Sequence, residues 1–392
     1  MPGRKIKRTI KDINKKIKKG NVVVVTADEM TEIVRHKGPE KAAMEIDVVT
    51  TGTFAPMCSS GAFINFGHTK PAIRASKVWL NDVPAYAGLA AVDIYIGATE
   101  VVEGDPLNMV HPGQFKYGGG HLINDLVAGK KIKLRAISYG TDCYPNRELE
   151  KRLTLEELPY AQLLNPRNGY QNYNCAINLS ERTIYTYMGV LKPLSGNANY
   201  CSAGQLSPLL NDPYYLTMGL GVKVFLGGAQ GYIIGPGTQH NPQVNRARNG
   251  TPLNPSGTLM LTGNLKEMDP RWLVGVSMLG YGCSLAVGFG VPIPILNTDM
   301  ARYTGVSDEN LFTQIVDYGD DYPKGNAKSL GKVSYSELKS GSIRFNGQDI
   351  PTVPISSYVR AREIAGLLKD WIEKGEFFLT EPQQAIPSGK MR

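Results

Sequence analysis

The amino-acid sequence predicts an α/β protein with a mixed or mostly parallel sheet, loop-rich and glycine-rich insertions and a C-terminal amphipathic helix. Short β-branched runs such as 22–26 are followed by helical patterns, which is typical of parallel strands joined by helices. The 43 glycines and 25 prolines indicate many turns. With 392 residues, 42% of them hydrophobic and 20% charged, the chain has an ordinary globular composition and can bury a large core.

Residues 4–19 are predicted to form a basic N-terminal helix. The segment holds nine lysines and arginines, and the formal net charge of the whole chain is +8. Its apolar stripe is formed by Ile6, Ile10, Ile13 and Ile17. We interpret the segment as a surface helix with the isoleucines on the body and the lysines in solvent. No aromatic residues are interleaved, so we expect no nucleic-acid partner.

The next segments predict a β-α-β unit that ends beside a cysteine. A strand over 22–26 is followed by a helix over 27–37 and a second strand over 46–52. The turn after this second strand carries Cys58 in TGTFAPMCSSG. Because open α/β sheets bind ligands at the carboxyl ends of their strands, we expect Cys58 to lie at a ligand crevice.

The same pattern precedes a second cysteine, Cys143. Strands are predicted over 91–97 and 131–139, with a short helix over 121–128 between them. Cys143 follows the second of these strands in YGTDCYP. Other expected elements are a short helix that begins at Thr154 and strands over 175–179, 183–190 and 222–226.

A soft domain boundary is expected near residue 300. Residues 1–300 are predicted to form the catalytic body, and residues 301–392 an extension packed on it that ends in the amphipathic helix over 356–375. The uncharged stretch 272–298 is long enough to span a membrane, but its glycines and prolines favour a buried core segment. We therefore expect no membrane partner.

Cysteine usage indicates a reducing compartment. Five cysteines are an odd number, and no two of them have the two-residue spacing of zinc or thioredoxin-type sites. The N-terminus also lacks the uninterrupted apolar run of a signal peptide. We expect a cytoplasmic protein without a disulfide framework, and the spacing predicts no metal site.

Cys58 and Cys143 are the candidate reactive thiols, because polar turns supply the exposure and backbone N–H groups that favour thiolate. Asn65 and His68 follow Cys58 closely, and His68 is a candidate general acid or base. Asp142 next to Cys143 would raise the pKa of that thiol, so a compensating cation is expected.

Arg135 and Arg167 are the candidate cations. Arg167 lies in NPRNGY, where a turn would hold its guanidinium ready for a substrate carboxylate. The glycine-rich stretch 227–242 adds Gln239 and His240 as polar candidates, but it has no nucleotide-binding fingerprint. The three remaining cysteines are expected to pack in the core, although one of them could line a pocket; they are Cys175, Cys201 and Cys283, and the pocket candidate is Cys201.

Four strings together resemble the homocysteine biosynthesis, sulfur-incorporation family of methanogens and other anaerobes. They are TTGTFAPMCSSGAFINFGH, YGTDCYP, NPRNGYQNY and SAGQLSPLLNDP, and the resemblance covers about residues 10–382. It implies an enzyme that places sulfur from sulfide or a persulfide donor on the aldehyde carbon of L-aspartate semialdehyde, with reduction to L-homocysteine.

The resemblance also implies roles for the candidate residues. Cys143 would hold a persulfide, and Cys58 would resolve it or deliver the sulfur. His68 would protonate the departing hydroxyl, and Arg167 or Arg135 would pair with the substrate carboxylate. Electrons would come from a ferredoxin-like partner, and we expect neither a CBS module nor a ferredoxin module in this chain.

Two other functions and two structural questions stay open from the sequence. The opening strand in KGNVVVV, residues 19–25, and the glycine-rich turns also suit a coenzyme A or acyl transferase. A metal or iron–sulfur carrier that uses Cys58 and Cys143 is the second alternative, and a cluster could coexist with sulfur transfer. Whether the chain forms a homo-oligomer is also open, as is the hypothesis that its basic helix docks the electron donor.

Overall fold

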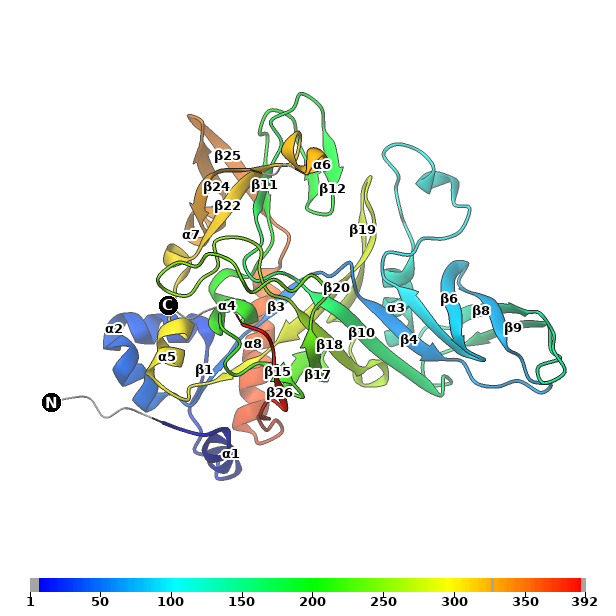
Figure 1. Cartoon of the computed structure of the whole chain (residues 1–392), viewed down its shortest axis with the longest axis horizontal. Coiled ribbons are helices and arrows are strands. Elements are labelled where there is room, and N and C mark those ends of the chain that lie inside the picture. The colour runs from blue at the N-terminus through cyan, green and yellow to red at the C-terminus, as the bar shows by residue number, and fades with distance from the viewer. Residues whose placement is uncertain (1–6, 326–327, 389–392) are drawn as a thin grey trace.

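The computed structural model describes residues 7–325 and 328–388 (Figure 1). Helix α1 (Ile10–Lys18) begins after Thr9, whose side chain accepts from the backbone of Asp12 while the Asp12 carboxylate accepts from Thr9 in return. The isoleucine stripe is buried, as predicted, at Ile10, Ile13 and Ile17. The helix starts later than residue 4, and residues 4–6 of the predicted segment lie outside the described residues.

Lys16 of α1 pairs with a buried carboxylate of the body. Its Nζ lies 2.7 Å from Oδ1 of Asp47, whose side chain is fully buried, and Arg8 lies 3.2 Å from the same oxygen. A buried carboxylate needs such partners, since an unpaired buried charge is costly. The pairing fastens α1 to the strand that follows Asp47.

The predicted β-α-β unit is confirmed. Strands β1 (Val24–Thr26) and β2 (Val48–Thr50) are parallel and joined by helix α2 (Ala27–Glu45). The helix runs past residue 37 but breaks at Gly38, where φ is 77°, before continuing from Pro39. Strand β21 (Pro292–Pro294) completes this small sheet antiparallel to β2.

The largest sheet, which we call the long sheet, has 13 strands, and every pairing in it is antiparallel. Its order is β19-β20-β16-β17-β18-β10-β4-β7-β6-β5-β8-β9, with β3 paired to β20. The strands are β3 (Thr53–Pro56), β4 (Gly61–Asn65), β5 (Ala75–Leu80), β6 (Val83–Ala90), β7 (Asp93–Gly97), β8 (Ile132–Ser138), β9 (Glu148–Leu153), β10 (Tyr160–Asn168), β16 (Lys223–Leu226), β17 (Ala229–Pro236), β18 (Leu259–Asn264), β19 (Leu273–Met278) and β20 (Gly282–Gly290).

A second sheet of six strands has the order β23-β22-β11-β14-β25-β24 and is mixed. Its strands are β11 (Cys175–Ile177), β14 (Ala198–Tyr200), β22 (Phe312–Asp317), β23 (Ser329–Ser334), β24 (Ser342–Phe345) and β25 (Gln348–Pro354). The pairs β11–β22 and β14–β25 are parallel. Strands from both sides of residue 300 therefore share this sheet, and the division into a body and an extension stays a prediction.

The α/β class with a mixed sheet is confirmed, but a mostly parallel arrangement is wrong, because antiparallel pairs dominate the described residues. Two short hairpin-like pairs are β12 (Ile184–Thr186) with β13 (Gly189–Leu191), and β15 (Gly219–Leu220) with β26 (Gln384–Ala385). Alternation of buried and exposed residues is the same in both strand directions, so local pattern does not reveal the direction.

The remaining helices are short except α8 (Tyr358–Glu373), which packs on β1, β3 and β20. Its buried side chains are Ala361, Ile364, Ala365, Leu368 and Ile372. The others are α3 (Gly119–Val127), α4 (Pro208–Asn211), α5 (Thr298–Thr304), α6 (Asp321–Lys324) and α7 (Tyr335–Lys339), with single turns η1 (Pro106–Asn108), η2 (Gly204–Leu206), η3 (Leu265–Glu267) and η4 (Asp308–Asn310). The short helix predicted from Thr154 is wrong, since its capping contacts to Glu157 close a turn before β10.

The uncharged stretch 272–298 folds mainly as β19, β20 and β21, and all nine residues of β20 are buried. This agrees with the predicted core segment. Within residues 7–325 and 328–388, no helix has the length and apolar character needed to cross a membrane.

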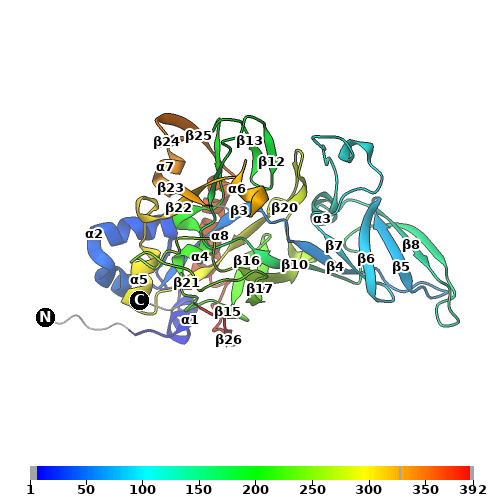
Figure 2. The same cartoon turned by 45° about the horizontal axis from the view of Figure 1, so that its top comes forward.

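Strands β5, β6, β8 and β9 form an arm that extends from the body, on the right in Figures 1 and 2. The pairing of β4 with its neighbours shows which end of the arm is nearer the body. Gly61 at the start of β4 pairs with Leu164 of β10, near the body, whereas Asn65 at its end pairs with Tyr160 and Asp93. We call the end of the arm near Asn65 its outer end.

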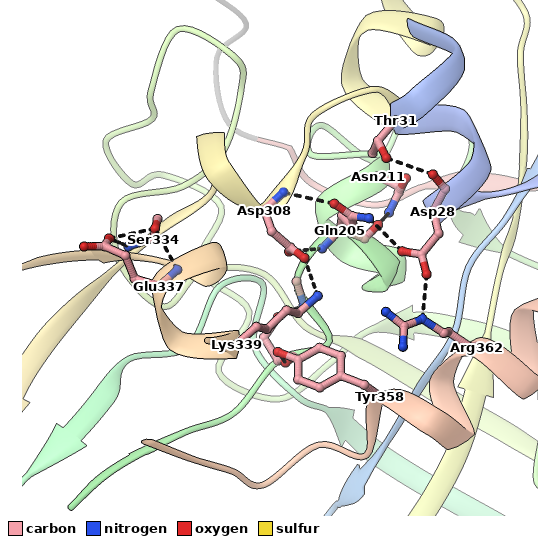
Figure 3. A network of polar contacts seen from close by, with 12 residues as sticks. Asp28, Thr31, Gln205, Asn211, Asp308, Ser334, Glu337, Lys339, Tyr358 and Arg362 are labelled. Atoms are coloured by element: carbon pink, nitrogen blue, oxygen red, sulfur yellow. Dashed lines mark hydrogen bonds and ion pairs between the residues drawn. The ribbon is translucent and has the colours of Figure 1, made fainter. Parts of the chain in front are cut away.

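A polar network links α2, α7, α8 and η4 through η2 (Figure 3). Gln205 of η2 donates from Nε2 to Asp28 of α2 at 2.7 Å, and from its backbone to Asp308 of η4 at 2.8 Å. Arg362 of α8 donates to the second carboxylate oxygen of Asp28 at 2.8 Å, and Lys339 of α7 pairs with Asp308. Helices from both ends of the chain thus hold η2 in place.

Candidate functional site

A cavity of about 350 Å³ lies where the long sheet and the six-stranded sheet meet. The turn after β3 and the end of β10 line it from the long sheet, and the segments around β14 and β25 line it from the other. Such a concave site with a few convergent polar groups is the expected place for a small ligand. Among its polar lining residues are Cys58, Arg167, Tyr170, Tyr173, Tyr187, Cys201, Gln239, Tyr281 and Ser356.

Cys58 lines this cavity from the turn between β3 and β4. Its side chain is partly buried, and Oγ of Ser284 on β20 donates to Sγ at 3.2 Å. Cys58 follows a strand and lines a cavity, but that strand is β3 of the antiparallel sheet and not β2, the second strand of the β-α-β unit.

Arg167 reaches the same cavity from the end of β10. The sequence predicted a turn at this position, but Arg167 belongs to a strand whose register with β18 shifts between Asn165 and Asn168. Irregularities of this kind redirect side chains next to sites. Oγ of Ser59 donates to the carbonyl oxygen of Arg167 at 2.7 Å, which fastens the Cys58 turn to this strand end.

The guanidinium of Arg167 makes no ion pair with any of the described residues. A free planar fork beside a nucleophile suits a carboxylate on a small substrate. A carboxylate held there would fix where the reacting carbon of the bound molecule lies relative to the Cys58 thiol, and such positioning accelerates a reaction.

Tyrosines form one wall of the cavity and are linked through their hydroxyl groups. The rings of Tyr170 and Tyr173 stack with centroids 5.2 Å apart, and the hydroxyl groups of Tyr173 and Tyr187 lie 2.7 Å apart. Tyr187 continues to Tyr318 at 3.2 Å, and Tyr318 donates to Asn174 at 2.8 Å. Phenols ionise near pH 10, so this wall supplies neutral donors at physiological pH.

Cys201 is the second thiol that lines the cavity. It directly follows β14, and its Sγ lies 3.6 Å from Oγ of Ser356. Burial raises the pKa of the Cys201 thiol and the nearby sulfur of Cys58 adds to this, while the contact with Ser356 opposes it. Cys201 is thus held as a neutral thiol opposite Cys58.

Cys143 lies elsewhere. It is exposed in the turn 141–144 after β8, and Ser138 at the end of β8 pairs with Ala75 at the outer end of the arm. Strand β4 separates this end from the Cys58 turn, and five residues of strand rise by about 16 Å. Because neighbouring strands of an antiparallel sheet alternate in direction, the carboxyl ends of β3 and β8 do not meet.

Two predicted residues of the first cysteine motif also lie at the outer end. Asn65 donates to Asp93 at 2.6 Å and accepts from the backbone of Gly67 at 2.9 Å, so its amide already has partners. His68 follows, next to Thr69, whose hydroxyl accepts from Asn146 of the Cys143 loop at 3.3 Å. His68 is therefore placed near the Cys143 loop and does not line the cavity.

The other predicted residues divide between the cavity and the rest of the molecule. Gln239 lines the cavity and accepts a hydrogen bond from Tyr170. His240 lies between Thr258 and Pro387, with both ring nitrogens in hydrogen-bonding contact with backbone atoms.

The remaining two lie on the arm. The guanidinium of Arg135 stacks over the ring of Trp79, its neighbour across β5 and β8, at 3.9 Å. Asp142 is exposed beside Cys143. Neither residue lines the cavity, so the structure brings Arg167 and Gln239 to Cys58 but leaves Arg135 and Asp142 on the arm.

No group of three or more His, Cys, Asp and Glu side chains is placed to hold a metal ion within the described parts of the chain. The cavity itself offers two thiols, Cys58 and Cys201, which do not make the three or four thiolates of an iron–sulfur cluster. We derive no step through a cluster.

The tyrosine wall and Cys201 are the functional candidates that sequence reasoning missed or ranked low. The segment 165–242 is visibly rich in tyrosine, asparagine and glycine, which was a usable signal of a polar wall. Cys201 stands in NYCSAG, a small and polar context like that of Cys58. Packing was the favoured expectation for Cys201, but it was also the pocket candidate among the three remaining cysteines, and it lines the cavity.

The model of the family described as "Homocysteine biosynthesis enzyme, sulfur-incorporation" matches residues 22–379. An L-aspartate semialdehyde sulfurtransferase of Methanosarcina acetivorans is 49% identical over 97% of this chain and 72% of that protein. One of Methanocaldococcus jannaschii is 47% identical over 96% of this chain and 72% of that protein. An uncharacterized protein of Methanothermobacter thermautotrophicus is 28% identical over 87% of this chain and 74% of its own length.

No solved structure matches the chain. The alternatives left open by the sequence, an acyl transferase and a metal or cluster carrier, find no support among these relatives. The similarity agrees with the extent of the resemblance expected from the sequence, about residues 10–382.

We predict that thiol alkylation by iodoacetamide near pH 8 separates the five cysteines. Cys143 reacts first because it is exposed, while Cys175 and Cys283 stay unmodified because burial raises their thiol pKa values to about 12 and about 11. Peptide mass spectrometry of timed samples measures the order. In denaturant all five should react, and modification of Cys175 in the folded protein as fast as Cys143 would contradict the assignment.

Proposed function

Because this chain belongs to the homocysteine biosynthesis, sulfur-incorporation family, we propose that it converts L-aspartate semialdehyde to L-homocysteine at the Cys58 cavity. The chain is a sulfurtransferase of homocysteine biosynthesis, as the sequence predicted. The observation that supports the cavity as the site is that the Cys58 thiol and the unpaired Arg167 guanidinium line it together, joined through Ser59.

The overall reaction balances with a two-electron reductant. The aldehyde RCHO, H₂S, two electrons and two protons give RCH₂SH and water. Sulfur forms a bond to the carbonyl carbon, the carbonyl electron pair moves to oxygen, and the oxygen leaves as water after protonation. The tyrosine hydroxyl groups on the cavity wall are the proposed donors to that oxygen, in place of His68, because Tyr173 and Tyr187 line the cavity.

Arg167 is the proposed partner of the substrate carboxylate, and Gln239 the proposed polar contact beside it. Asn65, Arg135, Asp142 and His240 lie outside the cavity, so we propose no substrate contact for them. A substrate of this size occupies only part of the cavity, which leaves room for the sulfur donor atom next to Cys58.

Cys143 is proposed as the thiol that accepts the outer sulfur of a persulfide or polysulfide donor, whose own thiolate leaves, since Cys143 is exposed to solvent. The Cys58 thiolate then attacks the outer sulfur of the Cys143 persulfide, which leaves Cys143 as a thiolate and Cys58 as the persulfide. The arm separates the two thiols within one chain. We therefore propose that the Cys143 that serves a cavity comes from a second copy of the chain.

We predict that Cys58→Ser and Cys143→Ser each lower homocysteine formation by at least about 10³-fold, because each removes a sulfur carrier. Co-expression of the two variants should restore activity, since a mixed assembly has one intact Cys58 facing one intact Cys143. Activity is measured as homocysteine formed from semialdehyde and inorganic polysulfide, with excess reductant, under anaerobic conditions. Cys175→Ser is the control that keeps activity, and a mixed assembly without activity would sink the exchange between copies.

We predict that Arg167→Ala raises KM for L-aspartate semialdehyde by about 10- to 100-fold, because hydrogen bonds between charged groups contribute about 1.5–3 kcal/mol. Steady-state kinetics at saturating sulfide measures it. Arg135→Ala is the matched control, since its guanidinium stacks on Trp79 outside the cavity. An unchanged KM in Arg167→Ala together with a raised KM in Arg135→Ala would transfer the role to Arg135.

The ferredoxin-like electron donor is proposed to dock on α1 through its exposed lysines. Lys15, Lys18 and Lys19 are exposed, whereas Lys16 pairs with the buried Asp47 and belongs to the fold. An acidic protein is attracted to such a surface, most strongly at low salt. The docking surface therefore consists of these three lysines without Lys16.

We predict that replacing Lys15, Lys18 and Lys19 by Gln raises KM for a reduced ferredoxin by about tenfold at low ionic strength. The rate with a small chemical reductant should not change. The control replaces Lys70, Lys77 and Lys131, which are exposed on the arm. Equal effects of the two triple variants would show that α1 is not the docking surface.

A further inference from the structure

The cavity contains one thiol for which the proposed function has no use. Cys58 and Cys201 both line it, one from the turn after β3 in the long sheet and the other directly after β14 in the six-stranded sheet. Each sulfur has a serine hydroxyl within contact, Ser284 at 3.2 Å from Cys58 and Ser356 at 3.6 Å from Cys201. The cavity therefore holds two thiols, and the sulfur of each one is in contact with its own serine hydroxyl.

We propose that Cys201 is the thiol that releases sulfur from the Cys58 persulfide as sulfide inside the cavity; this rests on the proposed function. Cys201 attacks Sγ of Cys58, the bond between Sγ and the outer sulfur breaks, and a Cys58–Cys201 disulfide forms. The Cys201 proton ends on the departing sulfur. The step, Cys58–S–S⁻ plus Cys201–SH giving the disulfide plus HS⁻, balances in atoms and charge without an external oxidant.

The hydrosulfide is released beside the substrate. It adds to the aldehyde carbon of the substrate whose carboxylate Arg167 holds, so the nucleophile does not pass through solvent. Two electrons from a low-potential dithiol or ferredoxin-like donor reopen the disulfide, and two more reduce the carbon. The proposal therefore requires four electrons for each persulfide sulfur that is used.

The state of Cys201 suits a thiol that acts second. Burial raises the pKa of its thiol, and negative charge on the Cys58 sulfur raises it further. A thiol held in this way keeps its proton until it reacts, which suits the resolving role.

The segment that carries Cys201 is held in place. Cys201 and Ser202 lead directly into η2, where Gln205 bonds to Asp28 and Asp308 (Figure 3). The hydroxyl of Tyr358 on α8 also donates to the carbonyl oxygen of Ser202 at 3.2 Å. Contacts on both sides of Cys201 keep its thiol at the cavity wall.

The other two core cysteines do not meet these conditions. Cys175 lies in β11 and is fully buried, and Cys283 in β20 is buried with its sulfur donating to the carbonyl oxygen of Phe115 at 3.3 Å. Neither lines the cavity. Cys175 is therefore the matched control for a variant at Cys201.

The test loads the full-length chain with inorganic polysulfide under anaerobic conditions, without semialdehyde. Released sulfide is trapped and measured, and peptide mass spectrometry maps persulfides and disulfides. The wild type should release sulfide and form the Cys58–Cys201 disulfide. In Cys201→Ser, Cys58 should keep the extra sulfur and sulfide release should fall by at least about tenfold. Cys175→Ser should behave as the wild type.

Three outcomes would overturn the proposal: wild-type sulfide release from Cys201→Ser, a disulfide that joins Cys58 to Cys143, or no sulfur on Cys58 after loading. The disulfide map of the wild type decides the matter even if the variant folds poorly, and Cys201→Ala is a second variant. Because semialdehyde is absent, disulfide formation without later homocysteine synthesis would count against the proposed function alone.

Discussion

The position of one sheet on the other is the constraint on which the candidate site depends. The walls of the cavity come from both sheets, because the long sheet contributes Cys58 and Arg167 and the six-stranded sheet contributes Cys201. Gln205 and its two carboxylate partners, Asp28 and Asp308, fasten η2 to α2 and η4, and Arg362 joins Asp28 to α8, which packs on β3 and β20 of the long sheet. Polar contacts of this kind favour a single arrangement, since an alternative docking would leave charged groups unpaired.

The chemistry of the site depends on the contacts that the two sheets give to its thiols and to its guanidinium. Sγ of Cys58 accepts a hydrogen bond from a serine hydroxyl, burial raises the pKa of the Cys201 thiol, and the guanidinium of Arg167 lines the cavity without an ion pair to any described residue. Tyrosine hydroxyl groups bring proton donors to the same space. The arrangement gives nucleophile, proton source and carboxylate binding to three separate groups of side chains, so each can be changed without removing the others.

Much of this could be predicted from the sequence, and the reasons for the failures are physical. The isoleucine stripe of α1, the β-α-β opening and the cavity position of Cys58 follow from local periodicity and turn chemistry, and long shared strings indicated the family. Strand direction was not readable, because side chains alternate in the same way in parallel and antiparallel strands. That error suggested that Cys143 meets Cys58 at one crevice, whereas it lies at the outer end of the arm; His68 was grouped with Cys58 because it is near it in the sequence, but strand β4 carries it away. Cys201 was ranked low because burial frequencies describe the average cysteine and do not show which buried surface faces a cavity.

Because of the arm, Cys143 and the two cavity thiols lie at separate places that differ in their exposure to solvent. The turn at Cys143 is open to any donor, including one too bulky to enter a cavity of about 350 Å³. In the proposed function, sulfur is collected at Cys143 and used on carbon at the cavity, so a large donor protein and a small, reactive aldehyde would not compete for the same entrance.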